Sequence, residues 1–453
     1  MLGPDFTSGR AVPMTVKSFD KPNPLATELN ATIAKESPAV LAMLSDFGKR
    51  IFFPKGILAQ AAEAKQKAKR FNATIGIAKE AGKPMFLPAV MKQLPGLTPA
   101  DALPYAPATG RPELRKAWRE ALLAKNPSLE GQSFSTPIVT AGVTHALSLV
   151  ADLFVDAGDT ILLPDKYWEN YDLLFGVRYG ARMETFPLFA AGGGIDVEGL
   201  RSALAGRKGQ TKTLLSFNFP NNPTGYSIQK KEAGAVVEVL LEAADAGTTL
   251  LVLCDDAYFG LFYEEDVLPE SLFARLAGRH ERILAVKADG PTKEEYVWGL
   301  RTGMLTFGTK AATDDQALYG ALEKKIAGAV RSAISNCSNL AQSVVAKAMA
   351  EPTFAEESRQ KQQTLEGRAR KVKEVLASAD FSDVWEAYPF NAGYFMCLKM
   401  KGDAETFRTH LLEKHGVGVI ADGAHDIRVA FAGVEEEEVP ELFRTLAKAA
   451  REL

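Results

Sequence analysis

A lysine and an arginine eight residues apart, Lys293 and Arg301, follow an apolar run at residues 282–286. The run has the composition of a strand, and Asp-Gly-Pro at 289–291 marks a break after it. An amine can form a covalent imine with an aldehyde, and a guanidinium can clamp an anion such as a phosphate. The pair favours a ligand that carries both groups, although such charges taken alone are most often solvated. Lys287, also near the end of the apolar run, is the competing candidate for the covalent amine.

An anion site and a stacking site are predicted on two earlier loops. The segment TAGVT, at residues 140–144, separates a predicted strand from a predicted helix over 145–154. A glycine at a helix N-terminus exposes backbone N–H groups to an anion, and Thr144 adds a hydroxyl. After the next apolar strand comes Trp168, whose indole could stack on a flat heteroaromatic ring. A plain turn and simple core packing are the alternatives.

Polar side chains also follow the next two apolar runs. Asn222 lies in the loop NFPNNPTG at 218–225, whose prolines form a stiff turn that fixes the amide in space. Asp255 ends the run at 250–254, where a carboxylate is costly unless it meets a cation. A protonated ring nitrogen would be such a cation, and a helix cap is the alternative. Tyr258 could share a phenolate oxygen with Asn222.

These residues need a common scaffold, and the chain predicts one. From about 137 to 310, predicted strands and helices alternate, and the runs at 160–163, 213–217 and 250–254 are almost continuously apolar. Such runs are typical of strands buried on both faces of a mostly parallel sheet. Ligands bind such sheets at the carboxyl ends of the strands, where every residue named above lies.

The flanking segments predict further regions. The N-terminal 50 residues show a helical pattern over 24–47, and a long polar helix is expected over 355–379. After it, strand and helix patterns alternate to the end, with a helix at 404–415. We expect an N-terminal extension with part of a small domain (1–85), a large α/β domain (86–350), and a connecting helix with an α+β C-terminal small domain (351–453).

Composition narrows the function classes. A net charge of −3 provides no field for capturing nucleic acid or an anionic membrane. The five histidines and three cysteines show no metal-ligand spacing, so no metal site is expected. No run approaches the ~20 apolar residues of a membrane span. The N-terminal MLGPDFTSGR lacks the apolar core of a signal peptide, so we expect a cytoplasmic protein.

Taken together, the motifs resemble those of fold-type I pyridoxal phosphate (PLP)-dependent aminotransferases, a class I/II α/β fold. NNPTG at 221–225, DDAY at 255–258 and TK at 292–293 with Arg301 come in that family's order and approximate spacing. The resemblance covers about residues 71–431. Within the family, the chain is most similar to the aspartate/aromatic amino acid aminotransferase branch, through the segments GKPMFLP (82–88), YWEN (167–170) and VRSAISN (330–336).

The resemblance implies PLP as cofactor and a role for each matching residue. Lys293 would bind PLP covalently and move the substrate proton, with Asp255 on the ring nitrogen and Tyr258 and Asn222 on the ring oxygen. Trp168 would stack on the ring. The phosphate would be bound by Gly142, Val143, Thr144, Thr292, Arg301 and, from a neighbouring subunit, Tyr105. One position departs from the pattern, since Gly290 stands where the family commonly has a phosphate-binding serine. Thr292 compensates for it, or the phosphate is held less tightly.

The implied reaction moves an amino group from an acidic or aromatic L-amino acid, aspartate-like favoured, to a 2-oxo acid such as 2-oxoglutarate. Arg428, with Gly76, Trp168 and Asn222 close by, would bind the substrate. Arg331 would reach across a homodimer interface to a second carboxylate, and a helix-surface arginine is its alternative. Other fold-type I chemistry, β-decarboxylation or C–S lysis, stays open. A PLP-sensing transcription regulator would need a DNA-binding module, for which the leading segment lacks a basic recognition helix.

Overall fold

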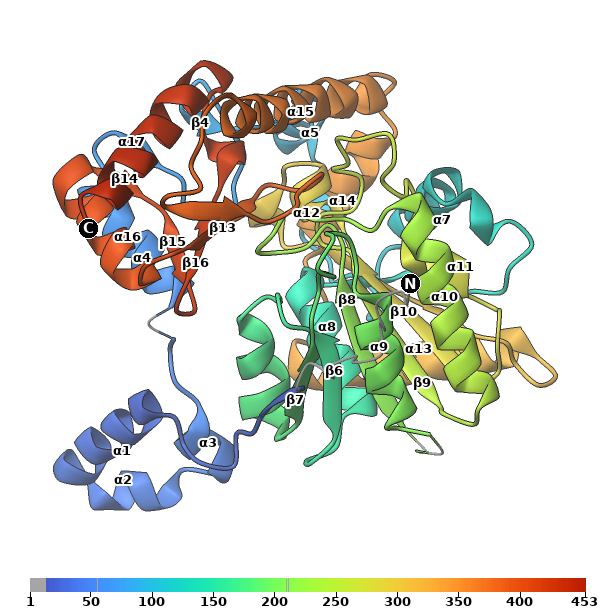
Figure 1. The fold of residues 1–453 in the computed structure, drawn as a ribbon. Helices are drawn as coiled ribbons and strands as arrows, with labels where there is room; N and C mark the ends of the chain where they lie inside the picture. The colour runs from blue at the N-terminus through green and yellow to red at the C-terminus, as the bar shows by residue number, and fades with distance from the viewer. Residues whose placement is uncertain (1–13, 55, 209, 211) are drawn as a thin grey trace, which may run out of the picture.

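The chain forms two lobes and a separate group of N-terminal helices (Figure 1). The structure is a computed structural model that describes residues 14–54, 56–208, 210 and 212–453. The segment on which the signal-peptide prediction depends, residues 1–10, lies outside the described residues. Among the helices that are described, we find none with the length and hydropathy that a membrane-spanning helix requires.

The large lobe is built on an eight-stranded sheet in the order β1-β7-β6-β8-β9-β10-β11-β5. The five strands from β7 to β10 are parallel, whereas β1, β11 and β5 pair antiparallel to their neighbours. The bounds are β1 Thr15–Lys17, β5 Ile138–Thr140, β6 Thr160–Pro164, β7 Arg182–Phe186, β8 Thr213–Asn218, β9 Leu250–Asp255, β10 Ile283–Asp289 and β11 Gly303–Gly308. The predicted, mostly parallel sheet is confirmed.

Both faces of this sheet are covered, which explains its almost continuous apolar strands. Along β9, Val252 and Cys254 pack with one helical layer and Leu251 and Leu253 with the other. The first layer contains α9 (Val197–Ala205), α10 (Lys230–Asp245) and α11 (Leu272–Leu276). The second contains α8 (Val143–Phe154), the π-helix η3 (Asp172–Val177) and α13 (Asp315–Ala333). Further helices of this lobe are α5 Pro88–Met91, α6 Pro99–Ala102, α7 Pro112–Lys125, α12 Pro291–Glu294 and α14 Asn339–Met349.

The small lobe contains an antiparallel sheet in the order β12-β13-β16-β15. Its strands are β12 Trp385–Ala387, β13 Met396–Met400, β15 Ile420–Asp422 and β16 Asp426–Val429, and its helices are α16 Ala404–His415 and α17 Val439–Arg451. The long helix α15, Phe354–Ser378, connects the lobes along the top of Figure 1. Two further pairs of short strands are present. Strand β2 (Phe71–Asn72) pairs with β14 (Val417–Gly418), and β3 (Lys79–Glu80) pairs with β4 (Lys83–Pro84).

The N-terminal helical pattern is broken into three short helices, α1 (Pro24–Glu36), α2 (Pro38–Met43) and α3 (Asp46–Arg50). Pro38 has no N–H and restricts Ser37 to an extended backbone, which ends α1. The side chain of Ser37 then caps α2, and that of Ser45 caps α3. The predicted single helix over 24–47 is therefore wrong in detail. Strand β1, from the same extension, adds an edge to the large sheet, and the domain boundaries at 85 and 350 stay predictions.

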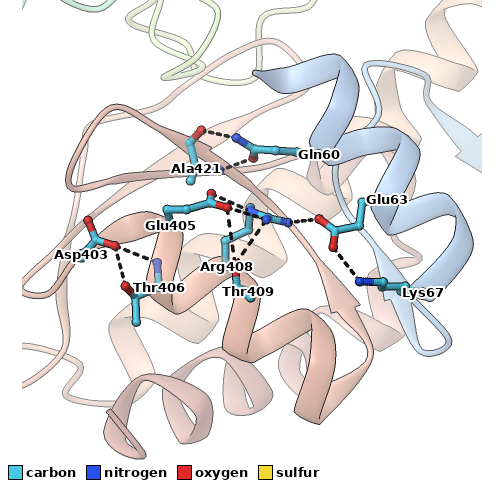
Figure 2. Close-up of polar contacts among 9 residues, drawn as sticks. All are labelled: Gln60, Glu63, Lys67, Asp403, Glu405, Thr406, Arg408, Thr409 and Ala421. Atoms are coloured by element: carbon cyan, nitrogen blue, oxygen red, sulfur yellow. Dashed lines mark hydrogen bonds and ion pairs between the residues drawn. The ribbon is translucent and has the colours of Figure 1, made fainter. Parts of the chain in front are cut away.

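Helix α4 (Ile57–Lys67) comes early in the chain but is fastened to the small lobe, as Figure 2 shows. The Gln60 side chain exchanges two hydrogen bonds with the backbone of Ala421, at 3.0 and 2.8 Å. Arg408 of α16, 6% exposed, donates to Glu63 of α4 at 2.9 Å and to both carboxylate oxygens of Glu405 at 2.8 and 2.6 Å. The first turn of α4 is thereby held at the interface between the lobes.

We predict that Arg408→Met lowers the free energy of unfolding by about 1–3 kcal/mol, because it removes charge-assisted hydrogen bonds from a buried guanidinium. Urea denaturation followed by circular dichroism measures the loss. Lys67→Met is the matched control, since it removes only the exposed Lys67–Glu63 pair (2.8 Å) and should cost less than ~0.5 kcal/mol. Equal losses in the two variants would contradict a fastening role for Arg408.

Candidate active site

A cavity of about 390 Å³ opens at the carboxyl ends of the parallel strands, where the two lobes meet. Eleven residues singled out from the sequence line it, namely Gly76, Val143, Thr144, Trp168, Asn222, Asp255, Tyr258, Thr292, Lys293, Arg301 and Arg428. They come from segments that are far apart in the sequence. The fold therefore brings the predicted covalent amine, anion clamp, carboxylate and aromatic ring into one site.

Lys293 lies on the short helix α12, directly after β10. Its Nζ donates a hydrogen bond to the backbone oxygen of Gly76 at 3.1 Å and lies 5.1 Å from the ring centroid of Tyr258. Burial lowers the pKa of Lys293 to about 8, and the positive charges of Arg428 and Arg301 act in the same direction. A neutral amine is thus available near physiological pH.

Lys287, the competing candidate, is occupied elsewhere. Its fully buried Nζ lies 2.5 Å from Asp256 Oδ2 and 3.3 Å from Asp289 Oδ2, and 4.1 Å from the ring centroid of Phe259. Burial alone would lower the pKa of Lys287, but the two carboxylates outweigh it and raise the pKa above its usual value. Lys287 is not among the residues that line the cavity, and its two carboxylate partners hold it as a charged ammonium.

Asp255 ends β9 and is 2% exposed. Its Oδ2 accepts a hydrogen bond from the Tyr171 hydroxyl at 2.5 Å and its Oδ1 from the Ala257 N–H at 3.2 Å, while Asn218 binds its backbone oxygen. Burial raises the pKa of Asp255 to about 6, and the bond from Tyr171 opposes the shift. The carboxylate is therefore mostly ionised at neutral pH and would gain from a cation in the cavity.

The anion clamp is built where α8 begins. Gly142 precedes the helix with φ 85°, and a Cβ there would come 2.6 Å from Arg301 Nη2. Only a glycine lets the guanidinium lie this close to the helix N-terminus. The N–H groups at the start of α8, the Thr144 side chain and the guanidinium of Arg301 together suit a phosphate.

The structure also explains Gly290. A Cβ on this residue would lie 2.7 Å from the Cα of Gly303 and 2.9 Å from the backbone oxygen of Thr302. The backbone of β11 thus excludes the serine expected from the resemblance. Thr292 lines the cavity two residues later, and its hydroxyl donates to the same Thr302 oxygen at 3.2 Å.

Arg428 lies at the opposite wall, on β16 of the small lobe, and is 3% exposed. Its Nη1 donates to Asn222 Oδ1 and its Nη2 to the Thr74 backbone oxygen, both at 3.0 Å. Its Nε is buried and has no hydrogen-bond partner among the described residues. The guanidinium stacks on Phe395 at 4.3 Å, so it is fixed while part of its donor capacity stays available.

Two predicted residues lie away from the cavity of this chain. Tyr105 is 88% exposed, and Arg331 is exposed and donates to Ser335 Oγ at 2.5 Å. Both were expected to act in a neighbouring subunit, so their placement leaves that prediction untested.

Sequence reasoning missed part of the site. Tyr171 carries no sequence signal of its own, although its hydroxyl contacts Asp255. The apolar part of the cavity lining was missed because apolar residues carry no chemical signal. It contains Ile57, Leu58 and Ala61 of α4, Ile75 and Ile77 after β2, Trp298, and Phe395 just before β13. Asn218, which precedes the recognised NNPTG motif by three residues, was the one member that the loop sequence itself could have indicated.

Known proteins were compared with the chain. The sequence model of the family described as Aminotransferase class I and II matches residues 74–446. A probable aspartate/prephenate aminotransferase of Aquifex aeolicus is 26% identical over 361 residues, which cover 77% of this chain and 84% of that protein. The aspartate/prephenate aminotransferase of Thermus thermophilus is 35% identical over 162 residues, 35% of this chain and 39% of that protein.

Solved structures support the same fold. The crystal structure of an aminotransferase from Anaerococcus prevotii superimposes with a TM-score of 0.80 at 22% identity, covering 90% of this chain and 99% of that one. A Thermus thermophilus aspartate aminotransferase variant gives a TM-score of 0.69 at 22% identity, with the same coverage. The fold class predicted from the motifs, a fold-type I α/β fold, is confirmed.

The two lysines lead to a prediction. In cofactor-free protein, labelling of Lys293 by an amine-reactive reagent should rise with pH through a midpoint near 8, since only the neutral amine reacts. Lys287 should stay unlabelled in the folded protein, because it is buried and charged. Peptide mass spectrometry after timed labelling measures both. Labelling of Lys287 before Lys293 would show that the assignment of the two lysines is reversed.

Proposed function

Since the chain belongs to the class I and II aminotransferases, we propose that it moves the amino group of an acidic or aromatic L-amino acid to a 2-oxo acid such as 2-oxoglutarate, with PLP as its cofactor. That it is an aminotransferase follows from the family. The cofactor, the residue roles and the substrate class are the proposal. One observation carries it: an amine with a lowered pKa, a buried carboxylate and an arginine at a helix N-terminus line the same cavity.

The residues fit PLP at each of its polar groups. The phosphate suits Arg301, Thr144, Thr292 and the N–H groups after Gly142, where a side chain would collide with the guanidinium. Lys293 would provide the covalent bond, Asp255 the partner of the ring nitrogen, and Asn222 and Tyr258 donors for the ring oxygen. Trp168 would stack on the ring. When bound, PLP supplies an electron-poor ring that withdraws electrons from the substrate Cα.

Substrate binding falls to Arg428. Asn222 and the Thr74 carbonyl fix the orientation of its guanidinium, and Phe395 packs against the plane of the guanidinium. The Nε–H has no acceptor among the described residues, so the guanidinium can still donate hydrogen bonds to a carboxylate. Gly76 lies beside the Lys293 amine, since a Cβ on this residue would lie 3.4 Å from Nζ. An amino acid held through its α-carboxylate would therefore have its Cα near that amine.

Lys293 would then act as the base. With a pKa near 8, Lys293 is partly neutral at physiological pH, so its Nζ can accept the proton from the substrate Cα. The same Nζ can then donate this proton to another atom on the side of the substrate that faces Lys293. The two arginines that lower its pKa are those proposed to bind the substrate carboxylate and the cofactor phosphate. Neutralising them on binding would raise the basicity of Lys293 when the base is needed.

A homodimer with shared sites is part of the proposal. Tyr105 and Arg331 are exposed, and Phe86, Leu103 and Leu340 are exposed apolar residues of the same lobe, as an interface would require. The three cysteines, all buried and free, fit a reducing cytoplasm.

The ring-nitrogen role of Asp255 leads to a prediction. Asp255→Ala should still bind PLP through Lys293, detectable by borohydride reduction and peptide mapping, yet slow Cα proton abstraction by orders of magnitude. Loss of deuterium from Cα-deuterated substrate measures that step. Near-normal exchange would contradict the assignment and leave Asp256, which binds Lys287 at 2.5 Å, as the remaining candidate.

The substrate class depends on Arg331. The wild type should transfer amino groups from aspartate and phenylalanine to 2-oxoglutarate, measured as keto-acid products across a panel of donors. Arg331→Leu should weaken the use of aspartate by ~2–4 kcal/mol in transition-state terms and barely change that of phenylalanine, because only aspartate carries a second carboxylate. Equal losses on both donors would show that Arg331 is structural, and no product from any donor would contradict the proposed function.

A further inference from the structure

A second cavity, of about 450 Å³, adjoins the catalytic cavity on the side of the N-terminal helices. It is lined by residues within 17–25, 50–58 and 168–177. Ile57, Leu58 and Trp168 line both cavities, so the two meet at the first turn of α4 and the proposed stacking residue. We refer to this second cavity as the side chamber.

The wall of the side chamber is fixed to the large lobe. Strand β1 pairs with β7, and the Phe19 ring packs directly against Gly176 of η3. Lys17 forms an ion pair with Asp172, whose other carboxylate oxygen accepts a hydrogen bond from Tyr167 at 3.0 Å. Residues 15–19 therefore form a part of the wall that is held by the large lobe.

The charged residues that line the side chamber differ in whether they have a partner or are exposed to solvent. Of its five charged lining residues, Lys17 and Asp172 pair with each other, and Lys21 and Glu169 are exposed to solvent. Arg50, at the end of α3, is half-buried, and its Nε is buried without a hydrogen-bond partner among the described residues. A buried guanidinium N–H without an acceptor is costly, so this position is suited to an anionic ligand.

The small volume of the catalytic cavity indicates that a long substrate would also occupy the side chamber. Ligand cavities generally measure about 300–1,000 Å³, and at 390 Å³ the catalytic cavity is near the lower end before PLP is accommodated. A long substrate side chain would have to extend past Ile57, Leu58 and Trp168, and the side chamber is what lies there. Arg428 and Arg50 would then stand at opposite ends of the substrate, each with a buried Nε for which the described residues provide no acceptor.

We propose that the side chamber is a substrate side-chain subsite, in which Arg50 binds the terminal carboxylate of an amino acid with a side chain longer than that of glutamate. The inference rests on the proposed aminotransferase function and extends it. Arg331 from a partner subunit would serve short dicarboxylates, whereas Arg50 lies in the same chain as the catalytic lysine. The methylene groups of the substrate would pack on the apolar residues Ile57 and Leu58.

Length-matched donors test the proposal. With PLP-loaded enzyme, kcat/KM is measured for 2-aminoadipate against norleucine and for 2-aminopimelate against 2-aminoheptanoate, each pair differing only in the terminal carboxylate. We expect Arg50→Met to lower kcat/KM for the two dicarboxylates by roughly 10–100-fold and to leave the two apolar donors unchanged. Lys49→Met is the matched control, because it removes the same charge from the same helix but lines neither cavity.

A binding measurement without turnover complements the kinetics. Adipate and pimelate should raise the melting temperature of the cofactor-free wild type and of Lys49→Met, but not of Arg50→Met. The Arg50 side chain makes no hydrogen bond or ion pair within the described part of the chain that its replacement could break, so the variant should fold.

The outcomes separate the inference from the function. Active wild type with equal dicarboxylate use by Arg50→Met and Lys49→Met overturns the subsite and leaves the aminotransferase intact. Equal loss on apolar and acidic donors shows that Arg50 only shapes the wall, which also overturns it. Absence of turnover with every donor in the wild type overturns the proposed function itself.

Discussion

Charge buried at the carboxyl ends of the central strands is the constraint on which the rest of the structure depends. Such charges are tolerated only when they are partnered. Behind the cavity, Lys287, Asp256 and Asp289 satisfy one another within the chain. In the cavity wall the partnering is incomplete among the described residues: Arg428 has a buried N–H without an acceptor, and Asp255 forms hydrogen bonds but no ion pair. The two sets of charges therefore differ: the buried set is neutralised within the chain, whereas the set that lines the cavity presents groups of both signs to it.

Neither lobe forms that site alone. The large lobe positions Asp255 and Lys293 by two adjacent parallel strands, β9 and β10. The small lobe supplies Arg428 and holds α4 through Gln60 and Arg408, so the lining residues of α4 come with it (Figure 2). Any change in the angle between the lobes therefore moves Arg428 and the lining residues of α4 together, relative to Lys293.

The sequence was sufficient for the sheet and for the polar members of the site, because each physical signal was local. Asp255 ends an apolar run, and Asn222 lies in a proline-stiffened loop, so both could be placed at strand ends before any coordinates. The contact between Tyr171 and Asp255 spans 84 positions, and no local pattern distinguishes Tyr171 from its aromatic neighbours. The apolar part of the cavity lining and the pairing of Lys287 are likewise products of packing. One N-terminal helix was predicted where three exist, because the helical spacing of apolar residues continues past Pro38. The break that this proline imposes on the backbone was given too little weight.

The short strand β1 has a consequence beyond its size. It covers the outer edge of β7, which would otherwise present unpaired N–H and C=O groups along a sheet margin. Open margins of this kind pair readily with other chains and promote aggregation. The three residues Thr15–Lys17 thus act as a guard against self-association, because an edge strand this short offers little template for further strand addition. A protein that began after Lys17 would lose this guard while keeping every residue that lines the cavity around Lys293.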